Sequence, residues 1–416
     1  EEAVAAARER RPDLSGDLFD FLRDLLNLTV SGEVEGELAM RFQQLTGPVM
    51  AKGVEDTAFY TFLRLTSLNE VGGDPGRFGV SPAEFHRACQ AAQERWPESM
   101  LATSTHDTKR SEDVRARLDL LSEIPEEWAA AVRRWISGNE RHWQGVSPDR
   151  SAEYLLYQTL VGAWPIDPER LWTYLEKALR EAKRKTSWTR PDPAYEESVR
   201  GFALGVLEDS AFRADLEAFV APLVAPGRIH SLAQVLLKLT APGVPDFYQG
   251  SELWDLSLVD PDNRRPVDYE LRQRLLADLA GNPTPEAILA RMDEGLPKLW
   301  LIRQGLHLRR RFPELFGRGA TYRSLPVHGA RAEHAVAFTR GEGVVTLVPR
   351  LVMKLGGDWG ETAVDLPAGR FRNELTGEEV DGGERPVAAL LARFPVALLC
   401  RDPQSKSLLG MKRSSA

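Results

Sequence analysis

STHDTKR, at residues 104–110, is the segment that decides the fold. It follows the short apolar run Met100-Leu101-Ala102 and precedes a charged helical pattern that begins near Ser111. We therefore expect a strand, a loop and a helix in succession. An α/β barrel carries its catalytic groups at the C-terminal ends of its strands. At such a position His106 and Asp107 could bind adjacent hydroxyl groups and stabilise positive charge, although Asp is also a good helix N-cap residue.

Two further segments have the pattern of a short strand that ends in polar residues. In GPVMAKGVEDTAFY, residues 47–60, we expect a strand near residues 48–51 and a helix from about Asp56. In APGVPDFYQGSE, residues 241–252, we expect a strand and a turn, followed by the polar loop DPDNRRPVDY at residues 260–269. These two segments and residues 104–110 therefore predict barrel-like strand and helix units.

The other segments up to about Arg311 are mostly helical. Residues 1–29 and 229–240 place apolar side chains at i, i+3 and i+4 spacing, and residues 111–225 contain no convincing strand. The glycine-rich residues 70–79 lack the Gly-Lys-Ser/Thr entry to a helix that phosphate binding requires. We therefore interpret them as a structural loop.

The C-terminal part of the chain has a different pattern. From Thr321 to Arg401, short β-rich runs alternate with glycine-containing turns, which indicates a small antiparallel β-sandwich. The runs are Ala335–Thr339, Val344–Pro349, Thr362–Leu366 and Pro395–Cys400. The polar residues from Ser405 to Ala416 are expected to be disordered.

Composition limits the possible classes of protein. The 416 residues carry a net charge of −8, which disfavours nucleic acid or an anionic membrane as a partner. No apolar run reaches the roughly 18 residues of a membrane helix. The two cysteines, Cys89 and Cys400, lie far apart and favour a reducing, cytoplasmic compartment. The chain starts with a helical pattern and without Met, so we interpret it as a fragment rather than as a protein with a signal peptide.

Several candidate residues have two interpretations. Lys109 and Arg110 are either a solvated helix start or part of a site, and two positive charges at a helix N-terminus oppose the macrodipole. Lys52 is either a surface lysine or a cationic donor to hydroxyl groups, and Tyr248 is either a flat platform for a ligand or a packing residue. Apart from His106, the histidines show no metal-ligand spacing, so no metal site is expected.

Three segments together resemble the maltooligosyltrehalose synthase family, which belongs to the α-amylase-type glycoside hydrolase clan. They are KGVEDTAFY at residues 52–60, STHDTKR at residues 104–110 and PGVPDFYQGSELWD at residues 242–255. Residues 260–269 fit the same family, and the resemblance extends from about residue 20 to residue 400.

The resemblance implies an α/β fold: a (β/α)₈ barrel with large helical insertions and a C-terminal antiparallel β-sandwich. It also implies an intramolecular transglucosylation of trehalose biosynthesis, in which the reducing-end α-1,4 bond of a maltooligosaccharide becomes an α,α-1,1 bond. Enzymes of the clan use a carboxylate nucleophile and a second carboxylic acid, held about 5–5.5 Å apart in retaining enzymes. A third carboxylate binds ring hydroxyls. Asp107 matches this third carboxylate, and His106 matches the hydroxyl-binding histidine beside it.

The matching segments imply further substrate-binding residues and no cofactor: Lys52, Lys109, Tyr248, Asn263 and Arg264. In the family pattern the nucleophile and the acid precede the segment at residues 52–60, and residues 1–46 match neither motif. The resemblance therefore implies that this chain carries barrel strands six to eight, the C-terminal half of the enzyme. We expect it to need the N-terminal half as a partner and to be inactive alone.

The predicted domain organisation follows from these segments. It comprises a helical insertion at 1–45, barrel strands six and seven at 46–111, a helical insertion domain at 112–226, barrel strand eight and closing helices at 227–314, the β-sandwich at 315–402 and a tail at 403–416. Two other functions stay open: a related amylase-type or trehalose-releasing hydrolase, and a non-catalytic sugar-binding module. Product analysis separates the hydrolase from the synthase, because only the hydrolase releases free reducing ends.

Overall fold

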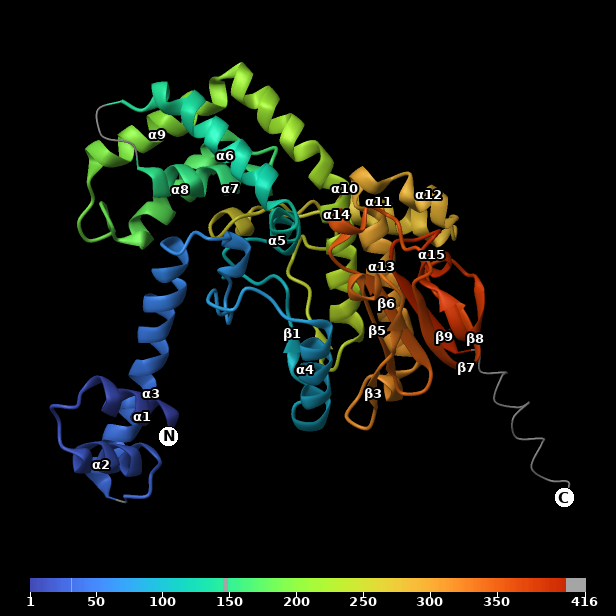
Figure 1. Ribbon diagram of the computed structural model, residues 1–416, viewed down its shortest axis with the longest axis horizontal. Helices are drawn as coiled ribbons and strands as arrows, with labels where there is room; N and C mark the ends of the chain where they lie inside the picture. Colours follow the sequence, from blue (N-terminus) through green and yellow to red (C-terminus); the bar gives the residue numbers. More distant parts are fainter. Residues whose placement is uncertain (31, 145–148, 402–416) are drawn as a thin grey trace, which may run out of the picture. The chain divides into compact units, whose positions relative to one another are not determined.

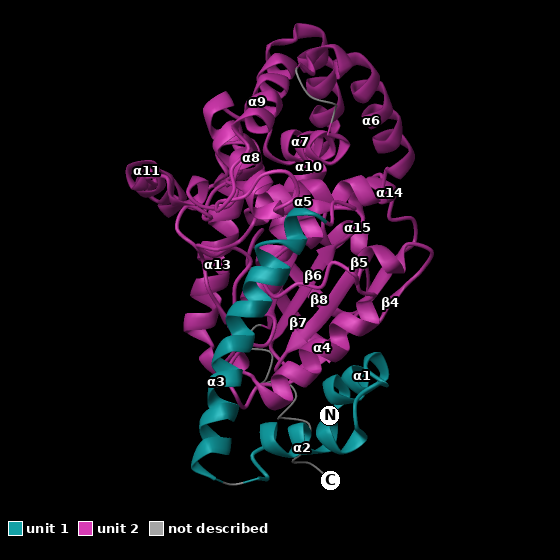
Figure 2. Ribbon diagram, turned by 90° about the vertical axis from the view of Figure 1, so that its left-hand side faces the viewer, with its two compact units in different colours: residues 1–61 teal, residues 62–416 magenta. Residues whose placement is uncertain are grey.

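The computed structural model describes residues 1–30, 32–144 and 149–401, which form two compact units. The first unit is Glu1–Thr61 and the second begins at Phe62 (Figures 1 and 2). The structure thus separates the N-terminal helices from the rest of the chain, and the finer domain division stays a prediction. The predicted tail at 403–416 lies outside the described residues.

Three helices make up most of the first unit: α1 (Glu2–Arg10), α2 (Gly16–Leu26) and α3 (Glu33–Met50). Ser15 caps α2 by accepting a hydrogen bond from the Asp17 amide. The expected helical character of residues 1–29 is confirmed. Apolar side chains of α2 and α3 remain exposed in large number, among them Leu18, Phe21, Leu38, Phe42, Leu45 and Val49.

The expected strand at residues 48–51 is wrong, because α3 runs to Met50 and continues as a π-helical turn, Ala51–Glu55. Leu38, Phe42, Leu45 and Val49 follow one another at spacings of four, three and four residues, which is a helical period. That period extends through the short apolar run that suggested a strand. The helix expected from Asp56 is also wrong, since only a short 3₁₀ turn, Ala58–Tyr60, follows.

The second unit contains a parallel pair of very short strands, β1 (Met100–Leu101) and β2 (Val244–Pro245). Both strands were expected from the sequence. Gly243, just before β2, has a φ of +136°, and a Cβ there would come within 2.6 Å of the Leu101 side chain. A glycine at this position therefore lets the two strands approach each other.

Helices dominate the segment between these strands. After β1 come α5 (Glu112–Asp119), α6 (Pro125–Asn139), α7 (Arg150–Ala163), α8 (Pro168–Ala182), α9 (Pro193–Glu208) and α10 (Ser210–Thr240). Helix α4 (Pro82–Arg95) precedes β1 and starts with a Ser81–Glu84 capping box. The expected absence of strands between 111 and 225 holds for the described residues, 112–144 and 149–225.

Helix α10 corrects one expectation. By length and composition it could cross a membrane, although no apolar run of that length was expected from the sequence. In the most apolar 18-residue window of α10, 44% of the window is buried inside the structure. It also packs against α5, α13 (Leu296–Arg311) and strand β6 (Val344–Pro349). These contacts are those of a core helix.

The C-terminal residues form one curled antiparallel sheet of seven strands, not the two facing sheets of the expected β-sandwich. The order is β3-β5-β6-β9-β7-β4, and β8 pairs with β7. The strands are β3 (Tyr322–Ser324), β4 (Val327–His328), β5 (Ala335–Arg340), β6 (Val344–Pro349), β7 (Ala363–Asn373), β8 (Glu379–Pro386) and β9 (Ala397–Arg401). Short helices α14 (Val352–Leu355) and α15 (Val387–Leu390) lie within the same region.

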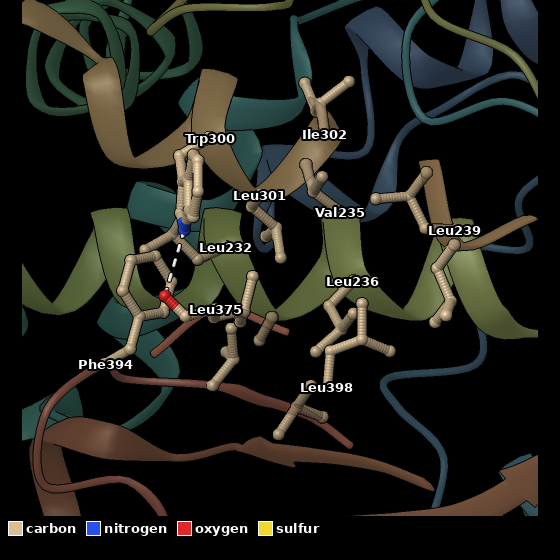
Figure 3. Close-up of a cluster of buried hydrophobic side chains, with 14 of the residues drawn as sticks. Leu232, Val235, Leu236, Leu239, Trp300, Leu301, Ile302, Leu375, Phe394 and Leu398 are labelled. Atoms are coloured by element: carbon tan, nitrogen blue, oxygen red, sulfur yellow. Dashed lines mark hydrogen bonds between the residues drawn. The ribbon is translucent and has the colours of Figure 1, made fainter. Parts of the chain in front are cut away.

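Apolar side chains are buried on both faces of this sheet. Val336 and Phe338 of β5 face a core shared with α10 and α13, whereas Ala335 and Ala337 face a second core shared with β7, α14 and α15. In the first core, leucines of α10 meet Trp300 and Leu301 of α13, and the Trp300 indole N–H donates to the Leu375 carbonyl at 3.1 Å (Figure 3). The curled sheet thus packs against helices α10 and α13 on one face and encloses a core between its own strands on the other. Two more helices, α11 (Tyr269–Ala280) and α12 (Pro285–Leu289), precede α13.

Candidate functional site

Two loops begin at the same edge of the parallel strand pair. Because β1 and β2 are parallel, their C-terminal ends lie side by side. The β1 loop (residues 102–111) and the β2 loop (residues 246–268) therefore start next to each other. Each loop contains residues that the sequence predicted as site residues.

Backbone and side-chain contacts hold the two loops together. The Asn263 amide group donates to the His106 carbonyl at 3.2 Å and to the Thr105 carbonyl at 3.4 Å. The Ser111 amide donates to the Ser257 carbonyl at 2.9 Å. Residues more than 140 positions apart in sequence are thus neighbours. In this structure the Asn263 side chain therefore holds the backbone at His106 by hydrogen bonds.

His106 and Asp107 lie at the outer part of the β1 loop. His106 is exposed, and the Asp107 side chain is 47% exposed. The Lys109 ammonium lies 3.6 Å from the Asp107 carboxylate and is almost fully buried. Of the interpretations of Lys109 and Arg110, the solvated helix start is therefore wrong: both side chains are buried.

Arg110 explains how the β1 loop is anchored to the helical region. Its guanidinium donates to the Tyr174 hydroxyl at 2.7 Å and to the Thr66 carbonyl at 3.3 Å. Arg110 also forms an isolated antiparallel bridge with Leu258 in the β2 loop. Arg110 is therefore a buried anchor of the β1 loop, whereas the Asp107 side chain is half-exposed.

Glu70 is a residue that the sequence did not single out. Its carboxylate accepts hydrogen bonds from the Lys109 amide at 2.8 Å and the Arg110 amide at 3.2 Å, and it pairs with Arg115 at 2.9 Å. It lies in the glycine-rich loop that was interpreted as structural, and residues 70–79 indeed contain no helix or strand. No local pattern distinguishes Glu70 from other polar loop residues.

Tyr248 and Arg264 lie in the β2 loop. The Tyr248 carbonyl accepts the Ser251 amide at 3.0 Å and the Ser251 hydroxyl at 2.7 Å, which closes a turn. The Tyr248 residue is half-buried, so both of its interpretations stay open. Arg264 is exposed in the 3₁₀ turn Asp262–Arg264.

Lys52 belongs to the first unit, and so does its partner Asp56. Its ammonium pairs with the Asp56 carboxylate at 2.5 Å, one helical turn further along the chain. The structure thus brings His106, Asp107, Lys109 and Asn263 together, while Lys52 lies in the other unit.

A cluster of buried charges lies where α5 follows the β1 loop. Lys298 of α13 contacts Glu112 at 2.7 Å and Asp113 at 2.8 Å, and Lys238 of α10 lies 3.4 Å from Glu112. Burial alone would raise the pKa of Glu112, but the Lys298 and Lys238 ammonium groups lower it to about 2. Burial raises the pKa of Asp113 and lowers the pKa of Lys238. Burial opposes the charge of Lys298, yet Asp113 and Glu112 raise its pKa.

Comparison with known proteins gives strong matches over nearly the whole chain. No family model matches it. Proteins of two Mycobacterium tuberculosis strains, both named maltooligosyl trehalose synthase, are 44% identical over 377 residues, 88% of this chain and 46% of each relative. The solved maltooligosyltrehalose synthase of Arthrobacter ramosus is 44% identical with a TM-score of 0.85, over 96% of this chain and 50% of that protein.

A more distant solved structure agrees. A hypothetical maltooligosyl trehalose synthase of Sulfolobus tokodaii is 31% identical with a TM-score of 0.75, over 93% of this chain and 49% of that protein. The chain spans about half the length of the relatives it matches.

Proposed function

We propose that this chain forms part of a synthase acting on maltooligosaccharides. The reason is that the chain belongs to the maltooligosyltrehalose synthase family and corresponds to the C-terminal half of that enzyme. The proposed reaction converts the reducing-end α-1,4 bond into an α,α-1,1 bond by intramolecular transfer. One observation carries this proposal: in a chain of this family, the loop with His106 and Asp107 is held against the loop with Asn263 at the C-terminal edge of a parallel strand pair.

The proposed roles follow from the exposure of each group. Asp107 offers a half-exposed carboxylate, which can accept hydrogen bonds from two sugar hydroxyls and stabilise the positive charge of an oxocarbenium-like transition state. His106 is exposed beside it and can bind a further hydroxyl. Lys109 lies 3.6 Å from the Asp107 carboxylate and is the proposed positive neighbour that orients it. Asn263 positions the His106 backbone, and Lys52, Tyr248 and Arg264 are proposed substrate contacts.

The proposed barrel is only partly contained in this chain. We propose that β1 and β2 are two neighbouring strands of a (β/α)₈ barrel, and that further strands come from the half of the enzyme that this chain does not span. Met100 of β1 and Val244 of β2 are 70% and 45% exposed, which is unusual for barrel strands and fits a partner that covers them.

The exposed apolar side chains of the first unit are a second argument for the same partner. The exposed apolar side chains of α2 and α3, such as Phe21, Leu38 and Phe42, would be costly in contact with water. We propose that the N-terminal half supplies the apolar surface that covers them. It would also supply the nucleophile and the general acid, which residues 1–46 do not match.

An assay on maltopentaose tests the proposal. This chain, the N-terminal half of the Arthrobacter ramosus enzyme, an equimolar mixture and a fusion of the two halves are compared by loss of reducing ends and by product analysis. The mixture or the fusion should form a non-reducing trehalosyl product. The chain alone should show no turnover, because removing members of a catalytic unit costs orders of magnitude in rate.

Other outcomes would favour the alternatives. Robust conversion by the chain alone would show that it contains its own nucleophile and would refute the half-enzyme proposal. New reducing ends would indicate a related hydrolase. A fusion that binds maltopentaose without converting it would support the non-catalytic sugar-binding module.

A further inference from the structure

The four charges beneath the site are among the most buried ionic groups of the described chain. The side chains of Lys298 and Glu112 are fully inaccessible to solvent, and those of Asp113 and Lys238 are 4% and 2% exposed. Buried ion pairs contribute little net stability, because the cost of desolvation offsets the attraction. Their retention in a core therefore calls for another explanation, and their contacts supply one.

Lys298 contacts both sides of the site. Its ammonium donates to the Asp113 carboxylate at 2.8 Å and lies 2.7 Å from the Glu112 carboxylate, both at the start of α5 directly after the β1 loop. The same ammonium donates to the Leu253 carbonyl, in the β2 loop, at 3.2 Å. An ammonium group has three N–H donors, and these three partners use all of them.

Asp113 and Glu112, the acidic partners of Lys298, make further hydrogen bonds to the β2 loop and the β1 loop. The Asp113 carboxylate accepts the Asp255 amide of the β2 loop at 2.7 Å. The Glu112 amide donates to the Ser104 hydroxyl at 2.9 Å, and the Glu112 carboxylate accepts the Thr103 hydroxyl, so both ends of the β1 loop are held. Lys238 also donates to Thr103 at 2.8 Å.

The start of α13 brings Lys298 close enough for these contacts. Gly295, the residue before the helix, has a φ of +79°, and a Cβ there would lie 3.0–3.1 Å from Leu253 and Trp254. The helix therefore begins directly against the β2 loop. Lys298 lies three residues after Gly295, and its side chain contacts both loops.

We propose that Lys298 is a positioning residue: its buried ammonium ties the β1 loop to the β2 loop and so fixes Asp107 relative to Asn263. The effect on turnover rests on the proposed function, whereas the effect on loop order does not. A displacement of about 1 Å at a reacting group can cost about 100-fold in rate. Loss of the tie should therefore lower kcat more than it changes KM.

Three variants test this role. Lys298→Met removes the ammonium at similar size and leaves two carboxylates opposite Lys238 alone. Lys298→Met/Asp113→Asn removes one charge of each sign and keeps an oxygen that can accept the Asp255 amide. Leu301→Ala on the same helix is the matched control, because Leu301 is fully buried in the apolar core and its side chain has no polar group that could bond to either loop.

Hydrogen exchange on the chain itself reads out loop order without any reaction. In Lys298→Met the amides of Asp255 and Glu112 should exchange at least 10-fold faster relative to amides of β6. In the double variant thermal stability should recover toward the wild type, but exchange at these amides should stay fast. In Leu301→Ala stability should fall while the ratio of loop exchange to β6 exchange stays unchanged.

Turnover of the fused enzyme gives the second readout. Lys298→Met and the double variant should both lower kcat at least 10-fold with a KM within about threefold of the wild type, and Leu301→Ala should retain kcat at a temperature where it is folded. Unchanged relative exchange, or a double variant that regains kcat together with stability, would overturn the positioning role. If the wild-type fusion has no activity, the proposed function fails and the exchange data still decide whether Lys298 ties the loops.

Discussion

The two β regions of the second unit are built in opposite ways. Every residue of β5 and β6 in the C-terminal sheet is buried, and apolar side chains cover both faces. The parallel pair has only two residues in each strand, and its outward residues Met100 and Val244 are largely exposed. The sheet region therefore derives its stability from its own apolar sequence. The loops that follow the parallel pair are held by polar and charged contacts in addition to apolar packing, and these contacts join the residues of the candidate site.

Removing a large side chain from the sheet core should produce the largest effect on stability. Phe338 is fully buried between Tyr322 and Phe85, with ring centroids 4.9 and 6.4 Å away. Phe338→Ala should lower the free energy of unfolding by about 3–5 kcal/mol, measured by urea denaturation of the chain. In the fused enzyme its kcat should stay near the wild type at a temperature where the variant is folded. A large loss of kcat would show that the sheet and the site are coupled.

At Asp107 the opposite result is expected: a substitution should lower kcat but leave stability almost unchanged. Asp107→Asn keeps the shape of the side chain and removes the charge that is proposed to stabilise the transition state. In the fused enzyme kcat should fall by roughly 100-fold or more, equivalent to about 3–4 kcal/mol. The urea midpoint of the chain should change little, because the carboxylate is half-exposed. His106→Ala, which removes the proposed hydroxyl binding, is the companion variant and should lower kcat less. Near wild-type turnover of Asp107→Asn would contradict the charge role.

The difference between the two regions also explains which elements the sequence predicts. Strands β1, β2, β5, β6 and β9 and the start of β7 were expected because each is a short apolar run bounded by turn residues. Strand β8 was missed, since Glu379–Pro386 is charged and contains two glycines. Its strand conformation comes from pairing with β7. The false strand at 48–51 arose where a short apolar run fits both periods and only the longer helical spacing decides.

The site shows the same division between local and distant information. His106, Asp107 and Asn263 could be found because each lies in a segment with a recognisable pattern. Glu70 and Lys298 could not, since they act across 39 and 185 residues of sequence and no periodicity reports such contacts. Residues in local motifs are thus easier to identify from the sequence than residues that hold those motifs in place from distant segments.

Glu70 gives a smaller test of this division. Glu70→Gln keeps one acceptor oxygen but replaces the second with a donor, so one of the Lys109 and Arg110 amides loses its acceptor, and the pair with Arg115 is lost. In the fused enzyme kcat should fall about 10-fold, with a smaller change in KM. Glu98→Gln is the control, because its ion pair with Arg318 lies on the surface of the same unit. Equal effects of the two variants would contradict a positioning role for Glu70.

The smallest expected effect concerns the tie between the β2 loop and α8. Arg170 of α8 donates two hydrogen bonds to the Asp262 carboxylate, at 2.8 and 2.9 Å, and the Leu258 amide donates a third at 2.8 Å. Burial would raise the pKa of Asp262, but the Arg170 and Leu258 hydrogen bonds outweigh it and lower the pKa. Asp262→Asn should therefore destabilise the chain by about 1–2 kcal/mol at pH 7.

The dependence of that difference on pH follows from the direction of the shift. A carboxyl with a lowered folded-state pKa stabilises the fold above its unfolded pKa of about 3.9, and this stabilisation is lost as the pH falls through the folded-state value. The gap between wild type and Asp262→Asn in urea denaturation should thus be full at pH 7 and pH 5 and should shrink below about pH 3.5. Asp365→Asn, at an exposed pair with His328, should show little change at any pH because solvent screens that contact. A gap at Asp262 that is as large at pH 3 as at pH 7 would mean that shape rather than charge ties the β2 loop to α8, and the contrast between a charge-held site and an apolar sheet would then not extend to this loop.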